Sequence, residues 1–260
     1  VTHGNGHPPG TGRLRVGKGV PPSELDAALP SPPDFRFYLD WARPLDDGAL
    51  YLALKYLKRL GGVAAFHCEN GSLIAAMEQE RLAAGKTGAA GYPMAHPETA
   101  EAEAVARLLR IAQAADAPVI LSPITCRDSL FELEQARKRG QSAYATTCPQ
   151  YLLLDDSVYY EGENAGRFVC SPPLRDQSQQ DPLWKALRRD SIQAVASSHR
   201  SFTLRQKESD PQDFTAIPAG LPGAENRGEL LYTFGVSARR SSCSAVEIVS
   251  GSTCRSGVIA

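Results

Sequence analysis

Val63-Ala64-Ala65-Phe66-His67-Cys68-Glu69-Asn70-Gly71 is the stretch of this sequence that decides its fold. It opens with four apolar residues, a length that suits a buried strand, and continues into His, Cys and Glu, whose side chains can carry chemistry. Gly61-Gly62 comes just before it and ends residues 46–60, where leucines recur at helical spacing. The stretch therefore predicts a buried strand that follows a helix and delivers His67 at its C-terminal end.

The same alternation of strand and helix continues on both sides of this stretch. Further strands are predicted at residues 35–39, 119–121, 143–146 and 192–197, and further helices at residues 73–84, 97–115, 129–139 and 182–189. In helix 97–115 the predicted apolar stripe consists of Ala102, Val105, Ala106, Leu108, Leu109 and Ala112. Regular alternation implies parallel βαβ units, and hence an α/β fold with functional side chains just after the strands.

Composition excludes several classes of protein. The formal net charge of the 260 residues is −1 and the charges are mixed, which argues against a nucleic-acid partner. The run Arg137-Lys138-Arg139 is interpreted as the solvated end of a helix. No run approaches the roughly 20 apolar residues that span a membrane, and residues 1–20 do not resemble a secretory signal.

The cysteine pattern points to a cytoplasmic protein with reduced thiols. The six cysteines are Cys68, Cys126, Cys148, Cys170, Cys243 and Cys254. They are scattered and form no Cys-x-x-Cys pair, so neither a disulfide framework nor a thiol-rich metal motif is indicated.

Three regions are predicted from the composition along the chain. Residues 1–33 are rich in Gly and Pro and are expected to be coil, because such a stretch sustains neither a helix nor a central strand. Residues 34–236 carry the alternating pattern and form the main domain. Residues 237–260 are rich in Ser, Cys and Arg and are interpreted as an irregular tail.

Four segments carry a family resemblance. They are His67-Cys68-Glu69-Asn70-Gly71, Thr147-Cys148-Pro149-Gln150-Tyr151-Leu152, Cys170-Ser171-Pro172-Pro173-Leu174-Arg175 and Gly220-Leu221-Pro222-Gly223-Ala224-Glu225-Asn226-Arg227. In this order they resemble the dihydropyrimidinase/hydantoinase family of the amidohydrolase superfamily, over roughly residues 35–236. The resemblance implies the later half of a (β/α)8 TIM barrel, and so a partial barrel here. It also implies a homo-oligomeric, zinc-dependent hydrolase of cyclic amides such as dihydropyrimidines or hydantoins.

Most catalytic positions implied by this resemblance hold unsuitable residues. His67 matches a single-histidine metal ligand. Arg36 stands where the family has a carboxylated lysine, and Pro123 where it has a second histidine ligand. Ser198 replaces the aspartate that binds metal and moves the proton, and Trp41 replaces the tyrosine that polarises the substrate. Arginine stays cationic, proline has no donor side chain, and a serine hydroxyl is a weak base and a poor ligand.

Other residues leave a restored site open as an alternative. No His-x-His pair occurs in the sequence, but Glu69, Cys68, Cys126 or His199 are candidate substitute ligands. Zinc is therefore expected to bind weakly or not at all. A nucleophilic pair of Cys68 with His67 is not expected, because neighbouring residues of a strand point to opposite faces.

Substrate binding is better supported by the resemblance than catalysis is. Ser171 and Asn226 match positions whose main chain binds the imide of the substrate ring, and backbone contacts do not depend on the side chain. Alternatively, both segments are rigid loops defined by their prolines. Two functions stay open: a cyclic-amide hydrolase that is inactive or crippled in this chain, and a non-catalytic relative that acts through oligomerisation.

Overall fold

The fold is built on one parallel β-sheet. The computed structural model describes residues 35–39, 46–160, 162–210 and 212–238. The strands are β1 (Phe35–Tyr38), β2 (Ala64–His67), β3 (Val119–Leu121), β4 (Ala143–Thr147) and β5 (Ala194–Val195). They pair in the order β1-β2-β3-β4-β5, all parallel, so β1 and β5 are the edges of the described sheet. The predicted α/β class is confirmed.

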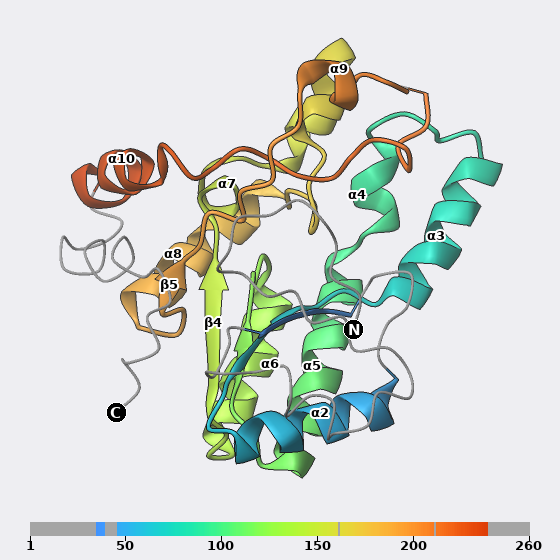
Figure 1. Ribbon diagram of the computed structural model, residues 1–260. Coiled ribbons are helices and arrows are strands. Elements are labelled where there is room, and N and C mark those ends of the chain that lie inside the picture. The colour runs from blue at the N-terminus through green and yellow to red at the C-terminus, as the bar shows by residue number, and fades with distance from the viewer. Residues whose placement is uncertain (1–34, 40–45, 161, 211, 239–260) are drawn as a thin grey trace.

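Helices alternate with the strands in the order that the sequence predicts. The α-helices are α2 (Asp47–Arg59), α3 (Gly71–Ala83), α4 (Gly91–Ala95), α5 (Glu98–Ala115), α6 (Arg127–Lys138), α7 (Pro149–Leu153), α8 (Gln180–Arg188), α9 (Leu204–Lys207) and α10 (Arg227–Leu231). Short 3-10 helices are η1 (Asp156–Tyr159), η2 (Gly162–Phe168) and η3 (Gln177–Gln179), and η4 (Tyr232–Ser237) is a π-helix. Figure 1 shows α9 and α10 beyond the end of the sheet toward which β4 points.

Local sequence explains where the main helices begin. The carboxylate of Asp46 accepts a hydrogen bond from the backbone N–H of Ala49 at 2.8 Å and so caps α2. Asn70 accepts from the N–H of Leu73 at 3.0 Å and caps α3 in the same way. Such side chains satisfy backbone donors that have no partner inside the helix. The cap of α3 directly follows Glu69, so the start of this helix fixes the residues after β2.

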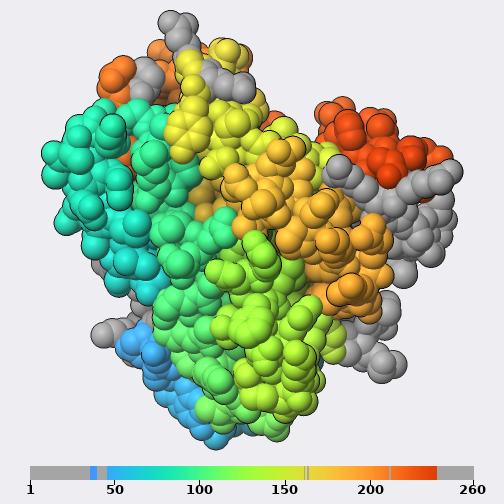
Figure 2. All heavy atoms as spheres, turned by 180° about the vertical axis from the view of Figure 1, so that it is seen from behind, coloured from blue at the N-terminus to red at the C-terminus, as the bar shows by residue number. Residues whose placement is uncertain are grey.

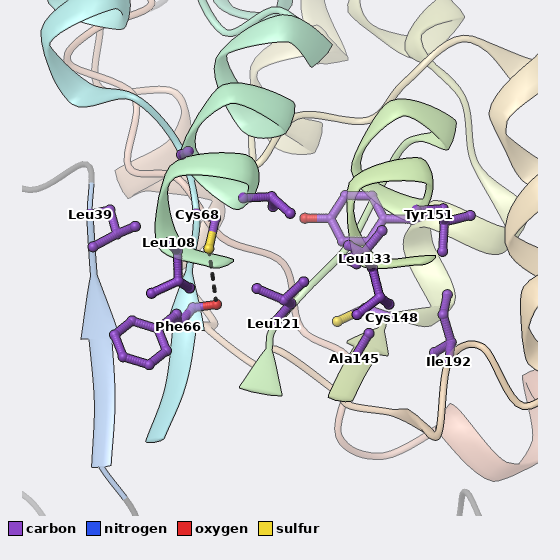
Figure 3. Packing of buried hydrophobic residues seen from close by; sticks show 14 of the residues in the cluster. Leu39, Phe66, Cys68, Leu108, Leu121, Leu133, Ala145, Cys148, Tyr151 and Ile192 are labelled. Carbon is purple, nitrogen blue, oxygen red and sulfur yellow. Dashed lines mark hydrogen bonds between the residues drawn. The ribbon is translucent and has the colours of Figure 1, made fainter. Parts of the chain in front are cut away.

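The two faces of the sheet differ in burial. Phe66, Leu121 and Ala145 lie on the face toward the helices and are buried. Figure 3 shows them packed near Leu108 and Leu133, and Figure 2 shows α5, α6 and α8 covering this side of the molecule. On the opposite face the alternating residues Ala65, Ile120, Tyr144 and Thr146 are only partly buried. The core therefore lies between the sheet and its helices.

Three details differ from the predictions. The strand predicted at residues 192–197 shortens to Ala194–Val195. In α5 the buried residues include Glu101 and Ala104, whereas Ala102 and Ala106 of the predicted stripe are only partly buried. The difference at Glu101 has a physical cause, because its charge is compensated within the core.

Arg137 is the third difference. It was interpreted as part of a solvated helix end, and Lys138 and Arg139 are exposed as predicted. The guanidinium of Arg137, however, donates to the carbonyl oxygens of Ala143 and Ser191 at 2.7 and 2.8 Å and to Oε1 of Gln193 at 2.9 Å. Arg137 thus ties α6 to the segments that begin β4 and β5.

The predicted regions at the two ends lie mostly outside the described residues. This applies to coil 1–33 entirely and to the tail 237–260 except for Ser237 and Ala238. Among the helices of the described part of the chain, none is both long and apolar enough to cross a membrane.

Candidate functional site

Parallel pairing brings the C-terminal ends of the strands to one edge of the sheet. Tyr38 of β1 is in register with His67 of β2, and their rings lie 5.5 Å apart. Ser122 follows β3, and Cys148 follows β4. This edge is where barrels of βα units place functional side chains. The side chains described next form the strand-end site, which consists of His67, Glu69, His96 and Ser171.

A fully buried carboxylate is the centre of the strand-end site. Oε2 of Glu69 lies 2.9 Å from Nε2 of His67 and accepts a hydrogen bond from the hydroxyl of Ser171 at 2.8 Å. Oγ of Ser171 is also 3.2 Å from Nε2 of His67. Because a carboxylate only accepts, the geometry places a proton on Nε2 of His67. The sequence analysis named His67 and Ser171 separately, as a metal-ligand position and a substrate-binding position, and did not predict the contact between their side chains.

His96 binds the other oxygen of this carboxylate. Its Nδ1 lies 3.4 Å from Oε1 of Glu69, and its Nε2 lies 3.4 Å from Oε1 of Glu78. The ring of Tyr92 stacks on His96 with 4.2 Å between centroids. Burial disfavours the charged imidazole, but the two carboxylates outweigh burial and raise the pKa of His96 to about 9. His96 is therefore a cation at neutral pH.

Glu69 is held in its ionised form by the same contacts. Burial alone would raise its pKa, yet the hydrogen bonds and charges of His67 and His96 hold the pKa of Glu69 well below its usual range. The carboxylate is thus the internal counter-charge of the His96 imidazolium.

A second buried ion pair, between Arg175 and Glu101, is connected to this site through His96. Nη2 of Arg175 donates to Oε2 of Glu101 at 2.9 Å, and Nε of Arg175 donates to Oγ1 of Thr125 at 2.9 Å. The backbone N–H of Thr125 donates to Oε1 of Glu101 at 2.9 Å, and its hydroxyl donates to Oε2 of the same carboxylate. Arg175 also donates to the carbonyl oxygen of His96. This network fixes His96 and the loop after β3.

Arg36, Pro123 and Ser198 are the residues that the resemblance implies at further metal-ligand positions. Nη2 of Arg36 donates to the carbonyl oxygen of Ser122 at 3.0 Å, next to Pro123. Ser198 lies after β5, in a left-handed backbone conformation with φ 44°. A fixed cation near Pro123 repels a metal ion, and neither Pro123 nor Ser198 offers a strong ligand.

The buried thiols near the strand ends are held in their protonated form. Burial raises the pKa of Cys148 to about 12 and keeps the thiol of Cys126 protonated as well. Sγ of Cys68 points into the core, 3.8 Å from the carbonyl oxygen of Phe66, as Figure 3 shows. Cys68 and His67 therefore face opposite sides, as expected. Across the described ranges, no group of three or more His, Cys, Asp or Glu side chains is arranged so that it could hold a metal ion.

The other predicted site residues lie elsewhere. Trp41 is outside the described residues. Asn226 is exposed and precedes α10, and its carbonyl oxygen accepts a hydrogen bond from the N–H of Leu230 at 2.9 Å. His199 is exposed, and its Nδ1 accepts from the N–H groups of Gly223 and Ala224 at 3.2 and 3.3 Å. His199 thus holds a loop and is not a member of the strand-end site.

Sequence reasoning missed His96, Glu78 and the pair of Glu101 with Arg175. His96 lies in a segment with no motif of its own, between two predicted helices. One signal was present for Glu101, because a carboxylate next to an apolar stripe is buried only when it has a partner. Arg175 belongs to one of the four segments that carry the family resemblance, but nothing in the sequence predicts that it pairs with Glu101.

Comparison with known proteins gives a consistent result. No protein-family model matches the chain. It is 38% identical over 210 residues to a D-phenylhydantoinase of Escherichia coli, which covers 80% of this chain and 45% of that protein. The structure matches a D-hydantoinase (dihydropyrimidinase) of a Thermus species with a TM-score of 0.86 and 31% identity, over 90% of this chain and 52% of the other.

A crystal structure of a dihydropyrimidinase from Brevibacillus agri also matches. Its TM-score is 0.81 at 32% identity, over 84% of this chain and 48% of the other. The chain spans about half the length of these relatives. The predicted partial (β/α)8 barrel and the predicted resemblance are both confirmed. Over most of its length the chain is thus similar to about half of a protein of the dihydropyrimidinase/hydantoinase family.

Proposed function

We propose that this chain is a hydrolytically impaired relative of the cyclic-amide hydrolases, with dihydropyrimidines or hydantoins as its substrate class. The observation that carries the proposal is the engagement of His67. Its Nε2 contacts Glu69 and Ser171, so the histidine that matches a metal ligand takes part in an internal hydrogen-bond network instead. The names of the relatives support the substrate class, and the replaced residues Pro123 and Ser198 support the loss of hydrolysis.

The residues at hand do not fit a zinc pair. His67 is the one residue at a family ligand position that keeps a metal-binding side chain. The Nε2 atom of its ring carries a proton that is directed at the carboxylate of Glu69. The cation of Arg36 lies next to Pro123. A catalytic zinc site needs about three protein ligands and a metal-bound water. We therefore propose that zinc is not a resident cofactor of this chain, and we assign no hydrolytic step to it.

Ureide binding is the part of the function that this chain is proposed to keep. The peptide N–H and C=O of Ser171 make no hydrogen bond to any other described residue, and the residue is partly exposed. They are thus available to the imide of a cyclic ureide, as is the backbone N–H of the exposed residue Asn226. Calorimetric titration with dihydrouracil tests this step. Absence of heat from saturable binding would remove ureide binding from the proposal.

Hydrolysis is tested on the purified full chain with dihydrouracil and with hydantoin, with and without added zinc. We expect no turnover above buffer and no stoichiometric zinc in elemental analysis after dialysis. Ser198→Asp alone should not restore activity, because metals are still missing. Ser197→Asp is the matched control for added charge at the same segment. Clear turnover by the wild type, or by Ser198→Asp but not Ser197→Asp, refutes the proposal.

A non-catalytic role through self-association is the second candidate function. Two observations favour it. The face of the sheet opposite the helices, with Ala65, Ile120 and Tyr144, is only partly buried, and β1 and β5 are the edge strands of the described sheet. Apolar surface and open strand edges both favour association between copies. Light scattering distinguishes this candidate from a monomeric protein.

A further inference from the structure

A large apolar cavity lies at the end of the molecule that carries α7, α9 and α10. Its volume is about 800 Å³, and its wall includes Phe202, Leu221 and Phe234. No residue of the strand-end site lines it, and neither does Asn226. The volume falls in the range of about 300–1,000 Å³ that is typical of pockets for small molecules. The cavity is therefore a candidate binding site beyond the proposed function.

Lys207 contributes to the wall of this cavity, and its side chain is buried. Lys207 is 4% exposed, and its Nζ donates to the carbonyl oxygen of Val169 at 2.6 Å. The same nitrogen lies 5.6 Å from the centroid of the Phe202 ring. Among the described residues no carboxylate forms an ion pair with it. A buried charge without a counter-charge is unfavourable, so the position favours an anionic ligand.

The position of Lys207 is fixed by its own short helix. Thr203 and Gln206 form a reciprocal capping box at the start of α9, and each side chain accepts a hydrogen bond from the backbone of the other. Such a cap defines the direction of the helix. Lys207 is the last residue of α9, and its ammonium is held by the hydrogen bond to the carbonyl oxygen of Val169.

The remaining charges around the cavity are consistent with an anion. No Asp or Glu lines it, and its second basic residue is Arg167. Arg167 is already paired with Glu208, at 2.7 Å from Nη2 to Oε1. The guanidinium of Arg200 lies 5.9 Å from the centroid of Phe202, on the same ring that Lys207 approaches. Lys207 is the lining cation that lacks a carboxylate partner within the described residues.

We propose that this cavity binds a monocarboxylate with an apolar chain or ring. Its carboxylate pairs with the ammonium of Lys207, and its apolar part packs against Phe202, Leu221 and Phe234. One cation selects a single negative charge, and an apolar wall without acidic residues selects an uncharged body. The alternative occupant, a purely apolar molecule, would leave the ammonium of Lys207 uncompensated.

Octanoate and octan-1-ol are the probes for this proposal, because they share a chain and differ in charge. Calorimetric titration of the 260-residue chain should show one saturable octanoate site, with octanol at least about tenfold weaker, as expected for loss of one charge-assisted hydrogen bond. Lys207→Met should weaken octanoate at least about tenfold and leave octanol unchanged. Lys185→Met, at an exposed position of α8, is the matched control and should change neither.

The outcomes separate the possibilities clearly. Equal affinity of the wild type for octanoate and octanol, or equal octanoate binding by Lys207→Met, would overturn the proposal and indicate an apolar site only. Absence of saturable octanoate binding would overturn it as well. The comparison of the two probes on the wild type needs no variant, so it decides the question even if Lys207→Met does not fold.

Discussion

The imidazole of His96 lies against the buried carboxylate of Glu69, with 3.4 Å between Nδ1 and Oε1. The two residues come from different segments, the loop after β2 and the loop before α5. Their contact links the strand-end site to the network of Arg175, which binds the carbonyl oxygen of His96. The ion pair is thus stabilised by the residues of the strand-end site and also by the network of Arg175. Its loss should therefore destabilise the edge of the sheet at which the strands end.

His96 should make stability depend on pH in a defined window. Its pKa is about 9 in the folded protein, against 6.5 for an ordinary histidine, so the folded state binds more protons between these values. Stability should therefore fall as pH rises from about 6.5 to about 9, by on the order of a few kcal/mol. Urea denaturation across this range measures the slope. His96→Asn should abolish it, while His199→Asn at an exposed position should keep it.

Glu69→Gln should be strongly destabilising at neutral pH. The substitution leaves the cation of His96 without its main counter-charge and weakens the contact of His67. Breaking a buried ion pair costs about 3–5 kcal/mol. Thermal unfolding followed by circular dichroism measures the change. Glu80→Gln, at an exposed position of α3, is the control and should change stability by less than about 0.5 kcal/mol. Equal effects of the two substitutions would contradict the assigned role of Glu69.

The pair of Glu101 and Arg175 should show strong coupling in a double-mutant cycle. Arg175→Met leaves Glu101 buried without a cation and should cost about 3–5 kcal/mol. The double variant Arg175→Met, Glu101→Gln should lose less than the sum of the single changes, because no charge is then left unpaired. Arg175→Lys should not restore stability, since a lysine cannot bind Glu101, Thr125 and the His96 carbonyl together. Strict additivity would show that the two groups do not interact.

Lys207 should have the opposite pH signature to His96. Burial and the nearby Arg200 lower its pKa to about 8, from an ordinary value of 10.5. The unfolded chain therefore binds more protons between these two values, and stability should rise as pH increases through this window. Lys207→Met should remove that rise and increase stability at neutral pH. Chemical denaturation at several pH values provides the measurement, and a retained rise would place its origin elsewhere.

Self-association should depend on the half-buried face of the sheet. We expect oligomers in light scattering at micromolar concentration, and Ile120→Lys should weaken association because it places a charge on that face. Phe131→Lys is the matched control, since Phe131 of α6 is 56% exposed on the helix side. If the wild type is a compact monomer, the proposed non-catalytic role through self-association is wrong.

Local periodicity predicted most of the fold. The strand at 119–121 agrees with β3 at both ends, and the predicted helix 97–115 differs from α5 by one residue at its start. These elements were predictable because burial imposes a regular spacing on apolar residues. The short helices α4, α7, α9 and α10 were missed, since one turn of helix has no period to detect.

The strand-end site was predictable only in part. His67 was identified as a site residue from its position after a buried strand and from the resemblance, whereas His96 and Glu78 were not identified. Their assembly depends on contacts between segments, and no spacing along the chain encodes such contacts. The interpretation of Arg137 as a solvated residue was wrong for the same reason. Its partners Ala143, Ser191 and Gln193 come from two other segments of the chain.

The order of the strands in the sheet equals their order in the chain. During synthesis, each described strand after β1 therefore leaves the ribosome when its neighbour has already been made. Every new βα unit can add to an existing edge without waiting for a distant segment, which suits domains that fold from the N-terminal side. A nascent chain that has reached Thr147 already contains both partners of three of the four strand pairs, β1 with β2, β2 with β3 and β3 with β4.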